Sequence, residues 1–261
     1  VDLGLRQGLV QLLRELVKVE TLRWIRPFYL YPQQVTDDLL DLYAGEEKIT
    51  KYIDMPLQHI NDRMLKRMHR LGDRAAIESL VDRIRTRIPM VTFRTAFIVG
   101  FPGETDAAYT ELRDYVERAE FDRVAVFLYS DEEGTGAVGL DEKVERDVMD
   151  ERRNAILSIQ ESISAAKGRA KVGSILEVLV DGRSEETEHV LEGRHEGLAP
   201  EIDGVVYIDE GQSDTTPQRP ARHNVSSPTP GEFCKVEITD ASSFDLVGHI
   251  GNPRTARREG A

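Results

Sequence analysis

The first 170 residues alternate between short apolar segments and longer segments with helical periodicity, and this alternation constrains the fold more than any other feature. In the longer segments apolar residues recur every three or four positions, as on one buried face of a helix. Strands that alternate with helices in this way form parallel sheets. The pattern therefore predicts an α/β domain over residues 1–170 with four βα units. The expected strands are 24–31, 52–57, 92–101 and 123–129.

The pattern changes after Gly168, where only short strand-like segments follow. Turn residues separate five of them, which is typical of a small closed β barrel of about OB-fold size. Residues 211–230 contain four prolines and few large apolar side chains, so we expect a loop within the barrel. The sequence predicts a five-stranded all-β domain over 171–251 and a polar tail over 252–261. The expected strands are 175–180, 188–193, 205–208, 233–239 and 245–250.

The chain is acidic, with 34 basic residues, 47 acidic residues and a formal net charge of −13. Most of the excess lies in residues 171–250, which contain 16 acidic and 6 basic residues. A negative field repels phosphate backbones and attracts basic proteins, so a basic protein partner is favoured over nucleic acid. The sequence contains neither a long apolar run nor a secretory leader, so we expect no membrane partner and a cytoplasmic location.

The single cysteine, Cys234, excludes a disulfide framework and any metal site built from several thiolates of this chain. Its place in a strand-like segment favours a small core residue over a nucleophile. The chain also has no Ser/His/Asp signature, no Walker loop and no His/Cys metal cluster. A functional site is therefore expected at the carboxyl ends of the parallel strands, where such domains bind ligands.

One strand end is rich in glycine. The segment 92–101 runs into Gly100, Pro102 and Gly103, and Glu104 then opens a helical segment. Glycines at this position would let a ligand approach the backbone. The alternative is a helix-initiating turn that needs glycine only for its dihedral angles. Taken alone, a glycine turn favours this structural alternative.

Two further positions could bind a ligand. Gln58 and His59 follow the segment 52–57 and could donate or accept hydrogen bonds at the same edge of the sheet. Capping of the next helix is the alternative for both, and for His59 capping or core packing is favoured. Arg94 lies within an apolar strand, where it would either clamp a carboxylate or form an internal salt bridge to Asp54 or Glu104.

Several motifs follow one another along nearly the whole chain. In the α/β part they are Trp24-Ile-Arg with Tyr31-Pro32, Tyr52-Ile-Asp-Met-Pro-Leu-Gln-His59, Leu65-Lys-Arg-Met68, Arg94-Thr-Ala-Phe-Ile-Val-Gly-Phe-Pro-Gly-Glu-Thr105 and Tyr129-Ser130 with Glu133-Gly-Thr135. In the β part they are Ala199-Pro-Glu-Ile-Asp-Gly-Val-Val-Tyr-Ile208 and Val236-Glu-Ile-Thr-Asp-Ala241 with Asp245-Leu246. Together they resemble the radical S-adenosylmethionine methylthiotransferases of the RimO type, with a C-terminal TRAM domain.

The resemblance implies a partial (βα)6 radical SAM barrel, of which the last four βα units are present, followed by a TRAM barrel. It implies S-adenosylmethionine and two [4Fe–4S] clusters as cofactors of the intact enzyme. The implied reaction is methylthiolation, C–H to C–SCH3, of the β-carbon of an aspartate in small-subunit ribosomal protein twelve. The residues that would hold S-adenosylmethionine are Gln58, Arg94, Gly100, Gly103 and Glu104, with Tyr129 lining the same mouth.

The chain also departs from the family pattern. It lacks the Cys-x3-Cys-x2-Cys loop that holds one cluster and the three further cysteines that hold the other. Asp131 and Gly136 stand where relatives often place prolines, which leaves the shape of that loop open. We therefore expect a truncated chain that is inactive alone.

Three alternatives remain at this point. The first is a tRNA methylthiotransferase of the MiaB type, which the acidic β domain disfavours because RNA binding calls for Lys and Arg. The second is a catalytically inert fragment that only docks the substrate. The third is an unrelated βα-barrel enzyme, for which the sequence offers no convincing acid/base pair.

Overall fold

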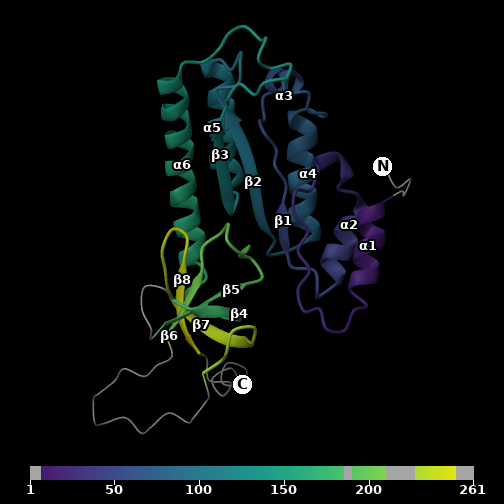
Figure 1. Cartoon of the computed structure of the whole chain (residues 1–261), viewed down its shortest axis with the longest axis vertical. Helices are drawn as coiled ribbons and strands as arrows, with labels where there is room; N and C mark the ends of the chain where they lie inside the picture. The colour runs from purple at the N-terminus through teal and green to yellow at the C-terminus, as the bar shows by residue number, and fades with distance from the viewer. Residues whose placement is uncertain (1–6, 185–189, 210–226, 251–261) are drawn as a thin grey trace. The chain divides into compact units, whose positions relative to one another are not determined.

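The computed structural model describes residues 7–184, 190–209 and 227–250, and the chain divides into two compact units, residues 1–163 and 164–261 (Figure 1). The division falls within the long helix α6 (Arg146–Arg169), before the boundary that we expected after residue 170. The expected domain limits stay a prediction. Within the described residues, no helix is long and apolar enough to cross a membrane.

The first unit contains a parallel three-stranded sheet in the order β1-β2-β3. Its strands are β1 (Tyr52–Asp54), β2 (Thr92–Val99) and β3 (Arg123–Leu128). Besides α6, the unit has α1 (Gly8–Leu16), α2 (Asp37–Gly45), α3 (Asp62–Arg67), α4 (Arg74–Arg87), α5 (Asp106–Ala119) and a 3-10 turn at Pro32–Gln34. Because helices α3 to α6 lie between or after the strands, the expected α/β architecture is confirmed.

Local sequence explains where the helices begin. At four helix starts, a polar side chain accepts a hydrogen bond from the backbone N–H three residues further on, which satisfies a donor that the helix itself leaves open. These residues are Thr36, Asn61, Asp73 and Thr105, at the starts of α2, α3, α4 and α5.

Aromatic packing on one face of β2 forms the centre of the first core. The rings of Phe93 and Phe97 lie 5.1 and 6.2 Å from that of Phe121, which precedes β3, and all three side chains are fully buried. Apolar residues of α4 and α5 complete this layer. The opposite face of β2 carries Arg94 and Ile98, which leaves that face for polar and ligand contacts.

The expected strand at 24–31 is not formed. The segment still runs beside β1, with one parallel bridge at Ile25 and a hydrogen bond from the N–H of Leu30 to the last residue of β1. Pro27 has no N–H to donate, and Tyr29 has a left-handed backbone with φ 57°. These two residues interrupt the ladder, so the strand expected from aromatic and β-branched content is wrong.

The second unit contains a closed five-stranded barrel in the order β4-β5-β6-β8-β7, which confirms the expected β domain. All pairs are antiparallel except the parallel pair β6–β8. Inward-facing aliphatic side chains fill the barrel, among them Val178, Val206 and Val236. The strands are β4 (Ile175–Arg183), β5 (Val190–His195), β6 (Val206–Asp209), β7 (Phe233–Ala241) and β8 (Leu246–Ile250).

Two expectations cannot be compared with the structure. Residues 210–226, which make up most of the expected loop, lie outside the described residues, and so does the expected tail from 252 onward. The described end of that loop, 227–230, contains neither helix nor strand.

The barrel interior leaves no room for a side chain at Gly248. A Cβ there would lie 2.5 Å from the carbonyl oxygen of Glu237 and 2.5 Å from Cγ1 of Val236. We expect Gly248→Ala to lower the free energy of unfolding by about 1–3 kcal/mol, as overpacking does in other cores. Urea unfolding of the barrel measures this. Gly182→Ala is the control, since nothing lies within 4 Å of a Cβ at that position. Equal stability of the two variants would contradict the packing argument.

Candidate functional site

The carboxyl ends of the three parallel strands lie at one edge of the sheet. Three loops follow them there, at 55–61, 100–105 and 129–145. Ligands of parallel α/β sheets bind at this edge because the loops and the open ends of the strands meet there. All six residues expected to hold the cofactor lie in or next to β2 and these loops.

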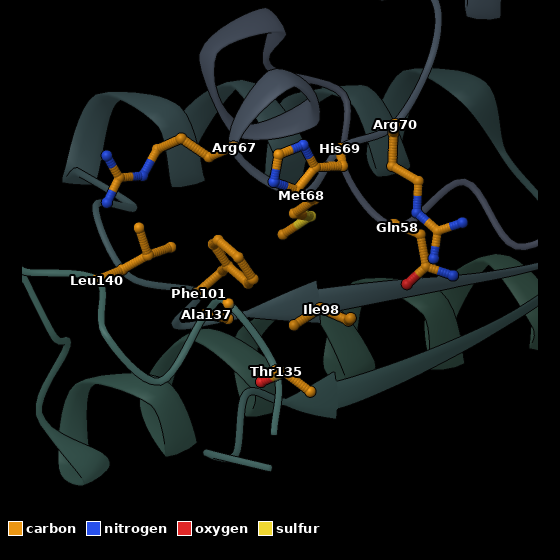
Figure 2. A pocket seen from close by; sticks show the side chains of 11 residues that line it. Gln58, Arg67, Met68, His69, Arg70, Ile98, Phe101, Thr135, Ala137 and Leu140 are labelled. Atoms are coloured by element: carbon orange, nitrogen blue, oxygen red, sulfur yellow. The ribbon is translucent and has the colours of Figure 1, made fainter. Parts of the chain in front are cut away.

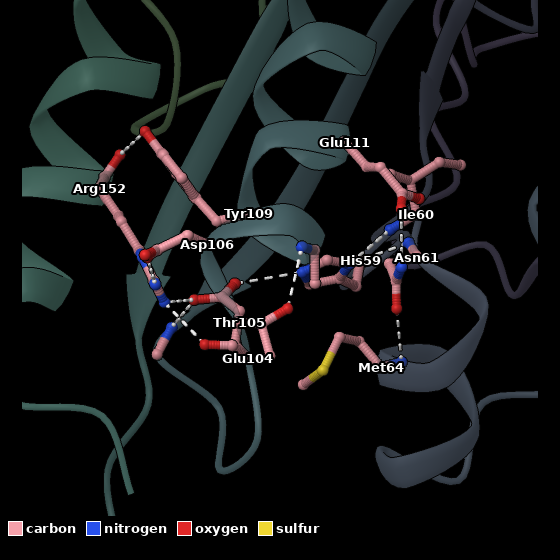
Figure 3. Close-up of polar contacts among 12 residues, drawn as sticks. His59, Ile60, Asn61, Met64, Glu104, Thr105, Asp106, Tyr109, Glu111 and Arg152 are labelled. Carbon is pink, nitrogen blue, oxygen red and sulfur yellow. Dashed lines mark hydrogen bonds and ion pairs between the residues drawn. The ribbon is translucent and has the colours of Figure 1, made fainter. Parts of the chain in front are cut away.

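A buried carboxylate ties the turn after β2 to the loop after β1 and to helix α6 (Figure 3). Glu104 Oε2 accepts a hydrogen bond from the N–H of Gly100 at 2.7 Å and one from Arg152 Nη1 at 2.6 Å. Its other oxygen lies 3.1 Å from His59 Nε2. The Glu104 and His59 side chains have no exposed surface, so Arg152 of α6 balances the carboxylate charge inside the protein.

His59 has a defined tautomer. Its Nδ1 accepts hydrogen bonds from the backbone N–H groups of Ile60 and Asn61, at 2.9 and 3.0 Å. The ring proton therefore lies on Nε2, which donates to Glu104. Of the two structural interpretations favoured for His59, core packing is confirmed, because the side chain is fully buried, whereas helix capping is wrong, because Asn61 caps α3. Both ring nitrogens of His59 are used within the protein.

The turn before Glu104 requires its glycines. Gly100 and Gly103 have φ values of 77° and 87°, in the region that favours glycine. A Cβ on Gly100 would lie 2.3 Å from Met149 Cγ, and one on Gly103 would lie 2.9 Å from Arg67 Nε. Backbone geometry and close packing therefore account for both glycines. Their contact with a cofactor stays a prediction.

Arg94 forms the internal salt bridge that we considered as one alternative. Its Nη1 lies 2.7 Å from Oδ1 of Asp54, which stands directly opposite in the β1–β2 register and is fully buried. The second carboxylate oxygen of Asp54 accepts a hydrogen bond from the N–H of Tyr29 at 3.0 Å. Arg94 thus stabilises a buried charge between two strands, and its role as a clamp for a cofactor carboxylate stays a prediction.

Tyr129 holds the loop after β3. Its hydroxyl donates to Asp131 Oδ1 at 2.7 Å, and Lys143 binds the same carboxylate and lies 5.1 Å from the centre of the Tyr129 ring. The hydrogen bond from Lys143 lowers the pKa of Asp131, and desolvation raises the pKa of Tyr129. The two ends of the loop are joined in this way, next to Phe101, whose ring meets that of Tyr129 edge-on at 5.0 Å.

A pocket of about 330 Å³ opens beside the turn (Figure 2). It has a partly apolar floor, and the loop after β3 forms one wall. This volume lies at the lower end of the range for small-molecule sites. The lining residues are Gln58, Arg67, Met68, His69, Arg70, Ile98, Phe101, Thr135, Gly136, Ala137 and Leu140.

Of the six predicted site residues, only Gln58 lines this pocket. Gly100, Gly103 and Glu104 form the adjoining turn, Tyr129 contacts the pocket wall through Phe101, and Arg94 is paired with Asp54. Sequence reasoning missed Arg70 and Arg152. Arg152 lies 48 positions from Glu104 in sequence, and no local pattern could have joined the two.

The chain offers different support for the two implied kinds of cofactor. A pocket of this size at the strand ends, next to a glycine turn, fits part of a nucleoside-containing ligand such as S-adenosylmethionine. The donor set does not fit an iron–sulfur cluster, which needs several thiolates. The single cysteine, Cys234, lies half-buried in β7, where burial raises the pKa of its thiol. In the part of the chain that the structure describes, no group of three metal-ligating side chains occurs.

Comparison with known proteins identifies both parts of the chain. Residues 172–250 match the TRAM domain family. The ribosomal protein uS12 methylthiotransferase RimO of Sorangium cellulosum is 47% identical over 95% of this chain and 48% of its own length. RimO of Anaeromyxobacter sp. (strain Fw109-5) is 46% identical over 98% of this chain and 52% of its own length. The chain matches the C-terminal part of RimO proteins.

The match confirms the resemblance that the motifs indicated. The chain spans about half the length of the curated relatives it matches and corresponds to their C-terminal part. A solved radical SAM enzyme, coproporphyrinogen III oxidase (HemN) from Escherichia coli, overlaps with 74% of this chain and 52% of its own at 15% identity and a TM-score of 0.46. That likeness is too distant to add to the family assignment.

Arg152 is the only cation that the described structure pairs with the Glu104 carboxylate, apart from the His59 ring. Arg152→Met leaves a buried carboxylate unbalanced, so we expect a loss of about 3–5 kcal/mol in unfolding free energy. Arg146→Gln is the matched control on the same helix, because its pair with Asp150 is solvent-exposed and contributes below about 1 kcal/mol. Denaturant unfolding of both variants measures the difference. If Arg152→Met were as stable as Arg146→Gln, the idea that Arg152 balances the buried charge of Glu104 would be contradicted.

Proposed function

We propose that this chain forms part of a radical S-adenosylmethionine enzyme that methylthiolates an aspartate β-carbon of ribosomal protein uS12. The observation that carries the proposal is the similarity to RimO proteins, at 40–47% identity over 92–98% of this chain. The same relatives do not favour the MiaB-type alternative that acts on tRNA. A cytoplasmic location, where ribosomal proteins are available, belongs to the proposal.

S-adenosylmethionine would supply the radical that removes hydrogen and the methyl group that is transferred. This chain would hold part of that cofactor at the carboxyl ends of β1 and β2. Gln58 is the predicted cofactor residue with direct access to the pocket. The Glu104–Arg152 pair fixes the neighbouring turn, and Phe101 and Leu140 form part of the apolar lining of the pocket.

The clusters of the intact enzyme have no ligands in this chain, and no step is derived through them. Cys234 alone cannot supply the thiolates, so we expect that cysteines outside these 261 residues hold the clusters. The chain taken alone would then bind ligands without catalysing the reaction. The interpretation in which the isolated chain only docks the substrate protein therefore stays open.

The acidic barrel is the proposed contact with the basic acceptor protein. Of its described charged residues, Glu177, Asp181, Glu196, Glu201, Asp209, Glu232 and Asp240 are exposed, against exposed Arg183 and Lys235. Charge complementarity of this kind speeds association with a basic protein and weakens with salt. The same surface opposes the phosphates of tRNA.

The activity is tested with the full-length protein that contains this chain, its clusters reconstituted, together with S-adenosylmethionine, a reductant and uS12. We expect mass spectrometry to find one methylthio group on an aspartate of uS12. The control is an aspartate-to-asparagine variant of the modified position in uS12, which should remain unmodified. Modification of tRNA in place of uS12 would overturn the proposal in favour of the MiaB-type alternative.

Docking is tested separately by binding of uS12 to the 261-residue chain. We expect Glu177→Lys combined with Asp240→Lys to weaken binding several-fold at low salt and much less at high salt, because screening removes the same attraction. Arg183→Gln is the control, which should bind at least as well as the parent chain. Tight binding of tRNA, or binding of uS12 that is insensitive to salt, would sink the docking proposal.

A further inference from the structure

Three polar side chains that line the pocket have no partner in the part of the chain that the structure describes. The side chains of Gln58, His69 and Arg70 form no hydrogen bond or ion pair there, although Gln58 and Arg70 are half-buried. Nearby polar groups such as Glu104, Arg67 and Tyr129 are all paired. The pocket therefore concentrates unused hydrogen-bonding capacity within an otherwise satisfied site.

The backbone at one of these positions is also unusual. Gln58 has φ 71°, in the left-handed region that costs energy for residues other than glycine. The φ of 51° at His69 has an ordinary cause, because His69 follows helix α3 in a Schellman motif, with its N–H donating to the carbonyl of Lys66. The surrounding structure compensates at Gln58, whose N–H donates to Ala96 and whose carbonyl accepts from Ile98. Residues with a strained backbone are often found at ligand sites, where the direction in which the side chain points matters more than the energetic cost of the backbone conformation.

The charge of the pocket is opposite to that of the chain. Arg67, His69 and Arg70 line it and no acidic residue does, whereas the chain carries a net charge of −13. Arg67 is used structurally, because its Nε donates to the carbonyl of Pro102 at 2.9 Å and its guanidinium lies 3.9 Å from Glu142. Arg70 is left as the cation that can meet a ligand.

The rest of the lining defines the body of that ligand. Met68, Ile98, Phe101 and Leu140 provide an apolar floor and wall. In Figure 2, Arg70 and Gln58 lie at one end of the pocket, and Arg67 and Leu140 lie at the other. The arrangement suits a ligand with an apolar or flat body and one anionic end.

We propose that this pocket is a carboxylate site, in which the Arg70 guanidinium and the Gln58 amide bind the carboxylate of a ligand whose body rests on Ile98 and Phe101. One free guanidinium with an adjacent amide matches a planar monoanion, since the fork of arginine pairs with both carboxylate oxygens. A phosphate would call for a helix N-terminus or a second free side chain with a permanent positive charge, and the described lining contains neither, since Arg67 is paired and His69 is an imidazole.

Two sources of a carboxylate are compatible with the proposed function: the amino-acid end of the cofactor and the acidic side chain of the acceptor protein. The choice of these two probes rests on the proposed function. The readout is binding, so loss of the methylthiolation activity through another cause would not affect it.

The experiment is calorimetric titration of the full 261-residue chain with two matched pairs of probes. The first pair is S-adenosylhomocysteine and its decarboxylated analogue. The second is a basic peptide with one aspartate and the same peptide with asparagine. Arg70→Gln removes the cation, Gln58→Glu repels the anion at nearly constant size, and Lys66→Gln is the control, an exposed cation of α3 that does not line the pocket.

We expect Arg70→Gln and Gln58→Glu to weaken binding of the carboxylate probe about tenfold or more and to leave its neutral counterpart unchanged. An effect on S-adenosylhomocysteine assigns the site to the cofactor, and an effect on the aspartate peptide assigns it to the acceptor. The Lys66→Gln control should bind like the parent chain. Thermal unfolding confirms that each variant folds, and Gln58→Glu provides the test if Arg70→Gln does not.

Two results would overturn the proposal. In the first, the parent chain binds neither carboxylate probe more tightly than its neutral counterpart. In the second, both pocket variants retain the preference of the parent chain for a carboxylate.

Discussion

The buried carboxylate of Glu104 is the interaction on which the candidate site depends. It joins the end of β2, through Gly100, to α6, through Arg152, and to the loop after β1, through His59. Each partner fills a different part of its hydrogen-bonding capacity, so the charge is balanced and desolvated at once. Without this group the turn after β2, the loop after β1 and helix α6 would have no common anchor.

The polar side chains around this anchor fall into two sets: those paired within the protein and those without a partner in the part of the chain that the structure describes. The resemblance to a known family made Glu104, Arg94 and Tyr129 candidates for cofactor binding. In the structure they are engaged with Arg152, Asp54 and Asp131. The groups left over, Gln58 and Arg70, line a cavity. The turn beside this cavity is fixed before a ligand binds, because the contacts of Glu104 do not need to change.

The two units carry charge in different ways. The barrel presents acidic residues on its strands and loops, whereas the lining of the pocket in the first unit includes Arg and His side chains and no acidic residue. An acidic surface favours a basic protein partner, and a local cationic pocket is needed to hold an anion against the overall negative field. Similarity to RimO proteins gives both features a common purpose in the proposed function.

Periodicity and local chemistry in the sequence were enough to predict the alternation of strands and helices, the parallel sheet and the five-stranded barrel. These depend on contacts between near neighbours and on the alternation of apolar residues. The strand expected at 24–31 failed because Pro27 and the left-handed Tyr29 interrupt a ladder that composition alone favoured.

The motifs also led to the family and to Gln58. Only the tertiary structure could decide which polar residues are free. Glu104 meets Arg152 from 48 positions away, and Arg94 meets Asp54 from 40 positions away. Pairing of buried charges depends on distance in space, and sequence spacing does not record it.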